Sequence, residues 1–418
     1  MEASSSIVDF TPSSFTAHDI RYEIPALLTN PSVKVLHLPT DRLDEASIKC
    51  ILMMLLRDDV GPCIEELRLS HVPIRGENSD RDGRKHSKSP FTQIVSSLKQ
   101  STGIKKLTIT DTTFNANDTS AVSSILYDIK SLRSLVLRQC GIDYKAASKI
   151  ACALASNTSV QLFDFSNNPI GNRGVSALAV ALEINTSIKK LKLSGTHLGI
   201  EGAVAIASVI TNNSTLEVLD LSRNSIGDMG SSKIAIALKS NKSVRQLSLR
   251  QNFLSDIGAM CISLSLYDNK NLQTILGCNH SIRYLNLCNN EVGKKCMLDI
   301  ETARRMNLHE SEKETIRQKV AFFLNNPSNT SYFGNSMTVE CMPYLLSAIS
   351  NTENITSLYN VVKYVNMPEL FEPKSCTGCA DSIFSNETDT PSASDKNIAI
   401  PAIVQVDDCE PSSALSMN

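Results

Sequence analysis

The sequence predicts an α/β solenoid, an open horseshoe with a parallel sheet on its concave side and helices on its convex side. Three observations predict it: one phrase recurs at a fixed interval, each copy alternates like a strand, and a helical stripe follows each copy. Parallel strands stack about 4.8 Å apart, whereas neighbouring helices need about 8 to 10 Å. A stack that contains both therefore bends with its strands inside.

The recurring phrase has an interval of 28 residues in the middle of the chain. A branched apolar residue opens it, leucines or similar residues follow, and Asn, Cys or Thr ends it. Five copies open at Leu132, Val160, Ile188, Leu216 and Val244, and less regular copies open at Val33, Ile64, Ile104 and Ile282. A fixed interval of this length is typical of a repeat array, so about nine repeats are expected.

Each copy is expected to join a strand to a helix. Leu219 and Leu221 alternate with Asp220, so the two leucines point to one side of an extended chain. The helical half has apolar residues at i, i+3, i+4 and i+7, which form one buried helix face, as at Val175, Leu178, Ala179 and Leu182. Asp228 is expected to cap the helix that follows its strand.

Asparagines recur in two columns. At strand ends an inward amide can donate to and accept from the next backbone turn, so a hydrogen-bond ladder is expected at Asn168, Asn224, Asn252 and Asn290. Cys140, Thr112 and Thr196 share this column, and Val72 breaks it. At helix ends the left-handed conformation is expected for Asn157, Asn185, Asn213, Asn241 and Asn269.

The repeats imply four regions. Residues 1–30 are expected to form an N-terminal segment with a capping helix, residues 31–299 the array, residues 300–373 a helical C-terminal cap, and residues 374–418 a disordered tail. Insertions interrupt the array at about 75–90 and 270–281. The first insertion is interpreted as a tolerated surface loop, with an arm that contacts a partner as the alternative.

Composition excludes several classes of function. Lys and Arg number 41 and Asp and Glu 43, a net charge of −2, so neither nucleic acid nor a membrane surface is expected as the main partner. The longest apolar run, Cys50 to Leu56, is far too short to span a bilayer. The start of the chain lacks the features of a secretory signal. A cytoplasmic location is therefore expected, a nuclear one remains open, and the twelve cysteines are interpreted as thiols.

Motifs of catalysis are absent from the sequence. It contains no P-loop, HExxH, GxSxG or GxGxxG, so no catalytic residue and no cofactor is predicted. A lone CxxC at Cys376 to Cys379 makes a weak zinc candidate. Packed thiols are the favoured interpretation of the denser group at Cys278, His280, Cys288 and Cys296. Glycosylation sequons that open at Asn157, Asn185, Asn213 and Asn241 follow the repeat, so turn chemistry explains them better.

Polar side chains that alternate with the buried leucines form the candidate binding face. The predicted partner contacts are Arg138, Asp164, Lys190, Lys192, Asp220, Arg223, Arg250 and Tyr284, and Ser248 and Asn286 lie beside them in the pattern. Any horseshoe has a solvated strand face, which is the alternative interpretation of each residue. As a group they indicate a protein-docking surface, in which Arg and Tyr are the best anchors.

The copies from about Val33 to Val292 resemble leucine-rich repeat proteins of the ribonuclease-inhibitor type, and the copy from Ile188 to Leu216 and its neighbours match that type well. The resemblance implies a right-handed leucine-rich repeat solenoid that binds a protein across its concave face as a scaffold, adaptor or sensor. The family includes the Ran GTPase-activating protein, so regulation of a small GTPase is the alternative. The tail lacks the acidic block of the Ran activators, and without a P-loop the chain does not match a complete NOD-like receptor.

Overall fold

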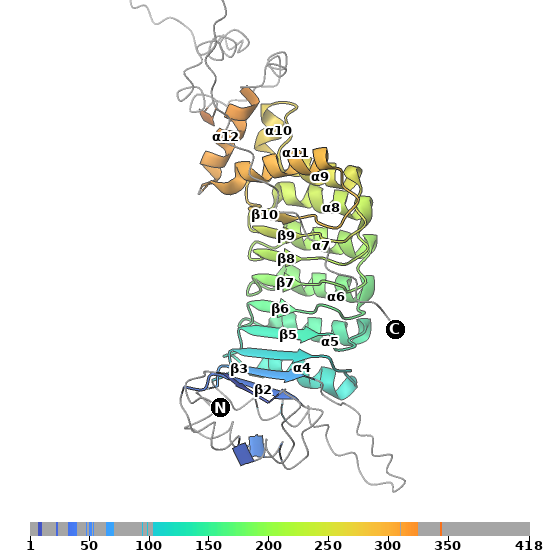
Figure 1. Cartoon of the computed structure of the whole chain (residues 1–418), viewed down its shortest axis with the longest axis vertical. Coiled ribbons are helices and arrows are strands. Elements are labelled where there is room, and N and C mark those ends of the chain that lie inside the picture. The colour runs from blue at the N-terminus through green and yellow to red at the C-terminus, as the bar shows by residue number, and fades with distance from the viewer. Residues whose placement is uncertain are drawn as a thin grey trace, which may run out of the picture.

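The computed structural model describes residues 7–10, 22–23, 32–39, 64–70, 103–309, 311–324 and 343–344, with residues 47, 50, 51, 53, 94 and 98 between them. These residues form one parallel sheet of ten strands in sequence order, with helices along one side (Figure 1). The strands are β1 Ile7–Asp9, β2 Val35–Pro39, β3 Glu66–Ser70, β4 Lys106–Thr110, β5 Ser134–Arg138, β6 Leu162–Asp164, β7 Lys190–Lys192, β8 Val218–Asp220, β9 Gln246–Ser248 and β10 Tyr284–Asn286. The predicted α/β solenoid is confirmed.

Helices alternate with the strands from β4 onward. They are α4 Ala116–Asp128, α5 Tyr144–Ser156, α6 Gly171–Ile184, α7 Ile200–Asn212, α8 Gly227–Ser240, α9 Asp256–Leu266, α10 Leu272–Leu276, α11 Lys294–Arg305, the 3-10 helix η3 Met306–Leu308 and α12 Glu312–Leu324. None of the helices built from described residues is long and apolar enough to cross a bilayer.

Strand β1 is an element that the repeat pattern did not predict. Ile7 pairs with Val35 and Asp9 with His37, so the sheet has one strand more than the nine openings imply. β1 has three residues and no following helical stripe, which leaves no periodic signal. Of the expected N-terminal capping helix only Tyr22 and Glu23 are described, and both are helical.

The predicted core is confirmed. Leu219 and Leu221 are at most 1 % exposed, and their counterparts in the other repeats join them in a single cluster. Phe163 and Phe165 occupy the same positions in β6 and just after it, with ring centroids 5.0 Å apart. The buried side chains of the recurring motif thus fill the space between the sheet and its helices.

The ladder at the strand ends is also confirmed at Asn168, Asn224 and Asn290, whereas Asn252 donates to Leu221 O at 2.9 Å but its Oδ1 accepts no hydrogen bond. Asn168 Oδ1 accepts from the backbone N–H of Cys140 at 2.9 Å and of Ile142 at 3.2 Å, and its Nδ2 donates to Leu137 O at 2.7 Å. Asn224 and Asn290 make the same contacts in their repeats. Each amide therefore satisfies buried backbone groups of the preceding repeat. Val72 lies outside the described residues.

The column at the helix ends differs from the prediction. Asn157, Asn185, Asn213 and Asn241 are extended rather than left-handed, with φ between −93° and −75°. Their amides bond the preceding repeat, as Asn213 Nδ2 does with Leu182 O at 2.7 Å. Asn279, not Asn269, continues the column, because the insertion moves the next turn along the chain. The left-handed backbone conformation is found instead one residue before positions of the strand-end column, at Asp111, Gln139, Asn167, Arg223, Gln251 and Asn289.

Asp228 does not cap its own helix. Its Oδ1 accepts from Ser255 N at 2.8 Å and Gly258 N at 3.0 Å, so it caps α9 in the next repeat. Asn172 does the same for α7 through Gly199 N and Gly202 N. Helix α8 already starts at Gly227, which has φ +61°, so Asp228 lies inside the first turn and points away from its own orphan N–H groups.

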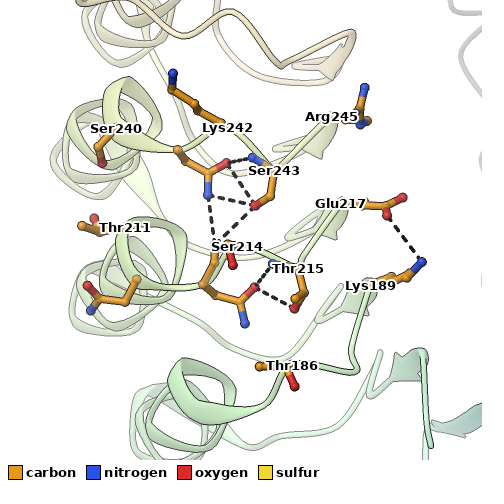
Figure 2. Close-up of a pocket in the computed structure, with 13 residues that line it drawn as sticks. Thr186, Lys189, Thr211, Ser214, Thr215, Glu217, Ser240, Lys242, Ser243 and Arg245 are labelled. Atoms are coloured by element: carbon orange, nitrogen blue, oxygen red, sulfur yellow. Dashed lines mark hydrogen bonds and ion pairs between the residues drawn. The ribbon is translucent and has the colours of Figure 1, made fainter. Parts of the chain in front are cut away.

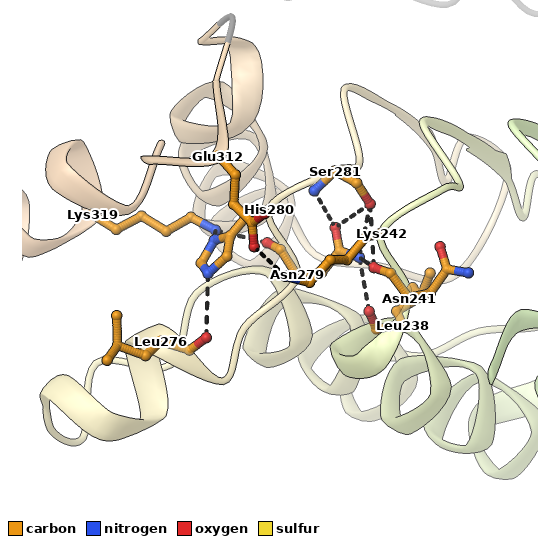
Figure 3. Close-up of polar contacts among 9 residues, drawn as sticks. All are labelled: Leu238, Asn241, Lys242, Leu276, Asn279, His280, Ser281, Glu312 and Lys319. Carbon is orange, nitrogen blue, oxygen red and sulfur yellow. Dashed lines mark hydrogen bonds and ion pairs between the residues drawn. The ribbon is translucent and has the colours of Figure 1, made fainter. Parts of the chain in front are cut away.

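The second insertion forms α10, which packs on α12 in a small separate core of Leu272, Ile275, Ile316, Val320, Phe323 and Leu324. Lys319 of α12 is fully buried beside it. Its Nζ donates to Leu266 O at 2.6 Å. It also donates to Asn279 O at 2.8 Å and to His280 Nδ1 at 2.9 Å (Figure 3). The described part of the predicted cap is thus fastened to the last repeats through buried polar contacts.

The remaining predicted regions are not covered by the structure. The insertion at 75–90, the tail at 374–418 and the cap beyond Leu324, apart from Pro343 and Tyr344, lie outside the described residues.

Candidate functional site on the strand face

The N-terminal half of the strand face has its charges paired. Glu66 on β3 accepts from Arg68 Nε at 2.6 Å and lies 2.9 Å from Lys106 Nζ on β4. Burial alone would raise the pKa of Glu66, but the hydrogen bonds and charges of Arg68 and Lys106 lower it below its ordinary value. The sequence did not single out these residues, although they occupy the same alternating positions as the predicted contacts.

Arg138 and Asp164 form the last such pair. Arg138 Nε and Nη2 lie 2.8 Å and 2.5 Å from Asp164 Oδ2, and Asp164 Oδ1 accepts from Ser166 N at 3.1 Å and Ser166 Oγ at 2.6 Å. The Asp164 side chain is 1 % exposed. Both carboxylate oxygens of Asp164 are hydrogen-bonded within the protein, so Asp164 links β5 to β6. A buried carboxylate with both oxygens occupied differs from an exposed side chain that a partner can contact.

The C-terminal half of the face, from β7 to β10, is different. Lys190, Lys192, Arg223 and Arg250 form no ion pair with any carboxylate among the described residues. Asp220 is the acidic residue among them, and its Oδ1 is occupied by Ser222 N at 3.0 Å and Ser222 Oγ at 2.6 Å. This half therefore presents uncompensated positive charge.

A cavity of about 430 Å³ lies on this half of the face, and we call it the strand-face hollow. It is lined by Lys192, Ser194, Val218, Leu219, Asp220, Ser222, Arg223, Gln246, Leu247, Ser248, Arg250, Tyr284 and Asn286. Its lining combines short side chains, such as those of Val218, Ser222 and Ser248, with long cationic and aromatic ones. Val218 sits between Lys190 and Gln246 in the register of the sheet.

Arg250 in the lining of the hollow is held by a neighbouring residue. Asn289, with its amide oxygen turned toward Arg250, accepts from Arg250 Nη2 at 2.9 Å and Nε at 3.2 Å. This partner orients the guanidinium without neutralising it. Tyr284 at the start of β10 is 52 % exposed, so its ring is accessible to a partner.

The hollow brings together five of the eight predicted contacts. Lys192, Asp220, Arg223, Arg250 and Tyr284 line it, together with Ser248 and Asn286. Lys190 lies outside the lining but two residues before Lys192 on β7, on the same side of the strand. Arg138 and Asp164 lie on β5 and β6 and bond to each other.

A second cavity, of about 540 Å³, lies where α7 and α8 end (Figure 2). Its lining consists of residues at the ends of helices and in the turns that follow them. The sequon hydroxyls bond the asparagines of the helix-end column, as Thr215 Oγ1 does with Asn213 Oδ1 at 3.1 Å. Lys189 pairs with Glu217 at 3.8 Å, and Lys242 pairs with Glu312 at 2.8 Å. Cations here complement the helix C-termini, so this cavity has a structural explanation, and turn chemistry explains the sequons.

The cysteine and histidine cluster does not form a metal site among the described residues. Cys278 Sγ accepts from Asp268 N at 3.1 Å, and His280 Nε2 lies 3.4 Å from Leu276 O. Burial and the charge of Lys319 lower the pKa of His280 to about 3, which keeps the ring neutral and its Nδ1 free to accept from Lys319. Cys376 and Cys379 lie outside the described residues.

The fold and the repeat geometry agree with a sequence comparison. A profile of the family described as Leucine Rich repeat matches residues 156–179, 185–207 and 212–235. The chain carries leucine-rich repeats. The three matched segments contain β6, β7 and β8 with the first part of the helix that follows each strand, and they include several residues that line the hollow, such as Lys192, Asp220 and Arg223. Comparison with curated proteins finds no match.

Three solved structures are similar in part. Leiomodin-1 actin-binding site 2 is 16 % identical, with 49 % of this chain and 97 % of that chain covered and a TM-score of 0.32. The tropomodulin C-terminal domain of Caenorhabditis elegans is 13 % identical, with 46 % and 93 % covered and a TM-score of 0.30. The yeast Rad7 and Elc1 complex gives 11 % identity, 68 % and 76 % coverage and a TM-score of 0.37. At these TM-scores none of them informs function.

Proposed function

We propose that this leucine-rich repeat chain is a non-enzymatic protein-interaction module, a scaffold, adaptor or sensor whose partner docks on the strand face between β7 and β10. The observation that supports this most is the strand-face hollow, because unpaired Lys192, Arg223 and Arg250 surround it beside the exposed Tyr284. Arg and Tyr are enriched among residues that dominate interface energies. Lys190 extends the contact area along β7.

The resemblance to leucine-rich repeat proteins of the ribonuclease-inhibitor type supports the same proposal, since that resemblance implies binding across the strands. A cytoplasmic location fits the seven free thiols of the described residues. Regulation of a small GTPase, the alternative, rests on the resemblance to the Ran activators alone. Hydrolysis and exchange rates of a GTPase panel, measured with and without the protein, test that alternative.

Site-directed photo-crosslinking tests the proposed docking face. A photoreactive phenylalanine analogue replaces Tyr284 in the hollow, or Met229 on the exposed side of α8 as the matched control. We expect one protein to crosslink from Tyr284 and not from Met229, and the purified protein to bind this chain with an affinity that Tyr284→Ala reduces. Crosslinks from Met229 alone would place docking on the helices instead.

A further inference from the structure

The distribution of ion pairs along the sheet changes at β7. Toward the N-terminus, Arg68 and Lys106 meet Glu66, and Arg138 meets Asp164. Asp164 is in register with Lys192 of β7, but its carboxylate is already occupied by Arg138 and Ser166. The strands beyond it contribute only Asp220 as a counter-charge to their cations.

We propose that the partner segment recognised at the strand-face hollow is acidic, an exposed protein segment that carries several closely spaced Asp or Glu side chains. This inference rests on the proposed docking function and specifies the chemistry of the partner. Lys190, Lys192, Arg223 and Arg250 oppose a single carboxylate, so a carboxylate-bearing segment supplies the counter-charges that the chain itself supplies at β3 to β6.

The geometry of the hollow fits such a segment. Lys192 on β7 is in register with Ser248 of β9, and Arg250 lies two residues beyond Ser248, so two strand spacings and a two-residue offset separate Lys192 from Arg250 by roughly 12 Å. Alternate side chains of an extended peptide are roughly 7 Å apart, so two carboxylates on one peptide face can reach both cations. The Arg250 guanidinium is oriented by Asn289 and keeps N–H groups for bidentate binding.

The lining of the hollow favours a protein segment over nucleic acid. Ser194 offers a hydroxyl that can donate to a carboxylate or a backbone carbonyl, whereas Ser222 Oγ already donates to Asp220 and lies 2.7 Å from Ser248 Oγ. Tyr284 is the single aromatic side chain in the lining, whereas single-stranded nucleic acid is held by several stacking aromatics along a basic groove.

Fluorescence anisotropy with a fluorescein-labelled peptide of eight glutamates tests the inference. The variants are Lys192→Gln with Arg250→Gln in the hollow, and Lys149→Gln with Lys233→Gln, which remove two exposed cations from α5 and α8. We expect the hollow variant to bind the peptide at least tenfold more weakly and the helix variant to match the unmodified chain. Binding should also weaken as salt rises, because the hollow is open to solvent.

Three results would overturn it. Equal binding by both variants would mean that charge over the whole surface, not the hollow, attracts the peptide. Tighter binding of a twelve-residue oligo-dT through Lys192 and Arg250 would identify nucleic acid as the ligand. Absence of peptide binding, with crosslinking from Tyr284 retained, would leave the docking function in place and refute the acidic partner.

Discussion

Arg138 and Asp164 are joined side by side across β5 and β6, with Nη2 of the arginine 2.5 Å from Oδ2 of the aspartate. The pair marks the boundary between two halves of one sheet face. Before it, the cations of the face meet carboxylates of the same chain. After it, Lys192, Arg223 and Arg250 do not.

Asp164→Asn is expected to destabilise the protein without weakening partner binding. The change removes a buried carboxylate that accepts from Arg138 and Ser166, and loss of charge-assisted hydrogen bonds costs about 1.5 to 3 kcal/mol. Chemical denaturation followed by far-UV circular dichroism measures the loss, since the chain has no Trp. Glu291→Gln, at an exposed loop position, is the control. A stability equal to that of the control would mean that Asp164 is not structural.

Leu219→Ala tests the register of the central repeats. Leu219 is 1 % exposed, and truncation of a buried leucine leaves a cavity that costs about 2 to 5 kcal/mol. Val218→Ala, one residue earlier on the strand face, is expected to lose much less because Val218 is only partly buried. Similar losses for the two variants in a denaturation experiment would refute the assigned register.

Asp228→Ala tests the capping between repeats. Removal of a helix-capping side chain costs about 1 kcal/mol, and here the loss falls on α9 because Asp228 bonds Ser255 and Gly258. Hydrogen exchange should therefore quicken in the first turn of α9 and stay unchanged in the first turn of α8. Lys233→Ala, on the exposed side of α8, is the control. Faster exchange confined to α8 would support the capping role expected from the sequence.

The buried Lys319 predicts a pH dependence. Burial lowers its pKa from 10.5 to about 7 in the folded protein. Between these values the unfolded chain binds one proton more than the folded chain, so the free energy of unfolding rises with pH. In denaturation experiments from about pH 7 to pH 10, the stability of the wild type relative to Lys319→Met should increase. If the free energies of unfolding of the wild type and of Lys319→Met changed with pH in the same way, the pKa of Lys319 would lie near its ordinary value.

Periodicity was sufficient for most of the fold. Leucines at a fixed interval define both the buried column and, by alternation, the exposed one, so the positions of Lys192 and Arg250 followed directly from Leu219 and its counterparts. Elements without a repeat were missed, as β1 was. Lys319 falls in the apolar stripe of Ile316 and Val320, and a charge at such a position is a signal of a buried polar contact.

The sequence could not separate paired from unpaired charges. Arg138 and Arg250 look equivalent in the alternating pattern, yet the first meets Asp164 and the second meets the neutral Asn289. Asp164 and Asn289 occupy different positions in the repeats that follow Arg138 and Arg250. In the sequence, the second insertion separates Asn289 from Arg250. Capping by Asp228 was misassigned for a similar reason, because the N–H groups that donate to its carboxylate lie in the next repeat.

The affinity of the partner crosslinked from Tyr284 for two charge-reversal variants tests the docking face most directly. Arg250→Glu reverses a charge in the strand-face hollow, and Lys149→Glu reverses one on the helix layer. We expect Arg250→Glu to raise the dissociation constant at least tenfold and Lys149→Glu to leave it unchanged. An unchanged dissociation constant for Arg250→Glu would contradict docking between β7 and β10.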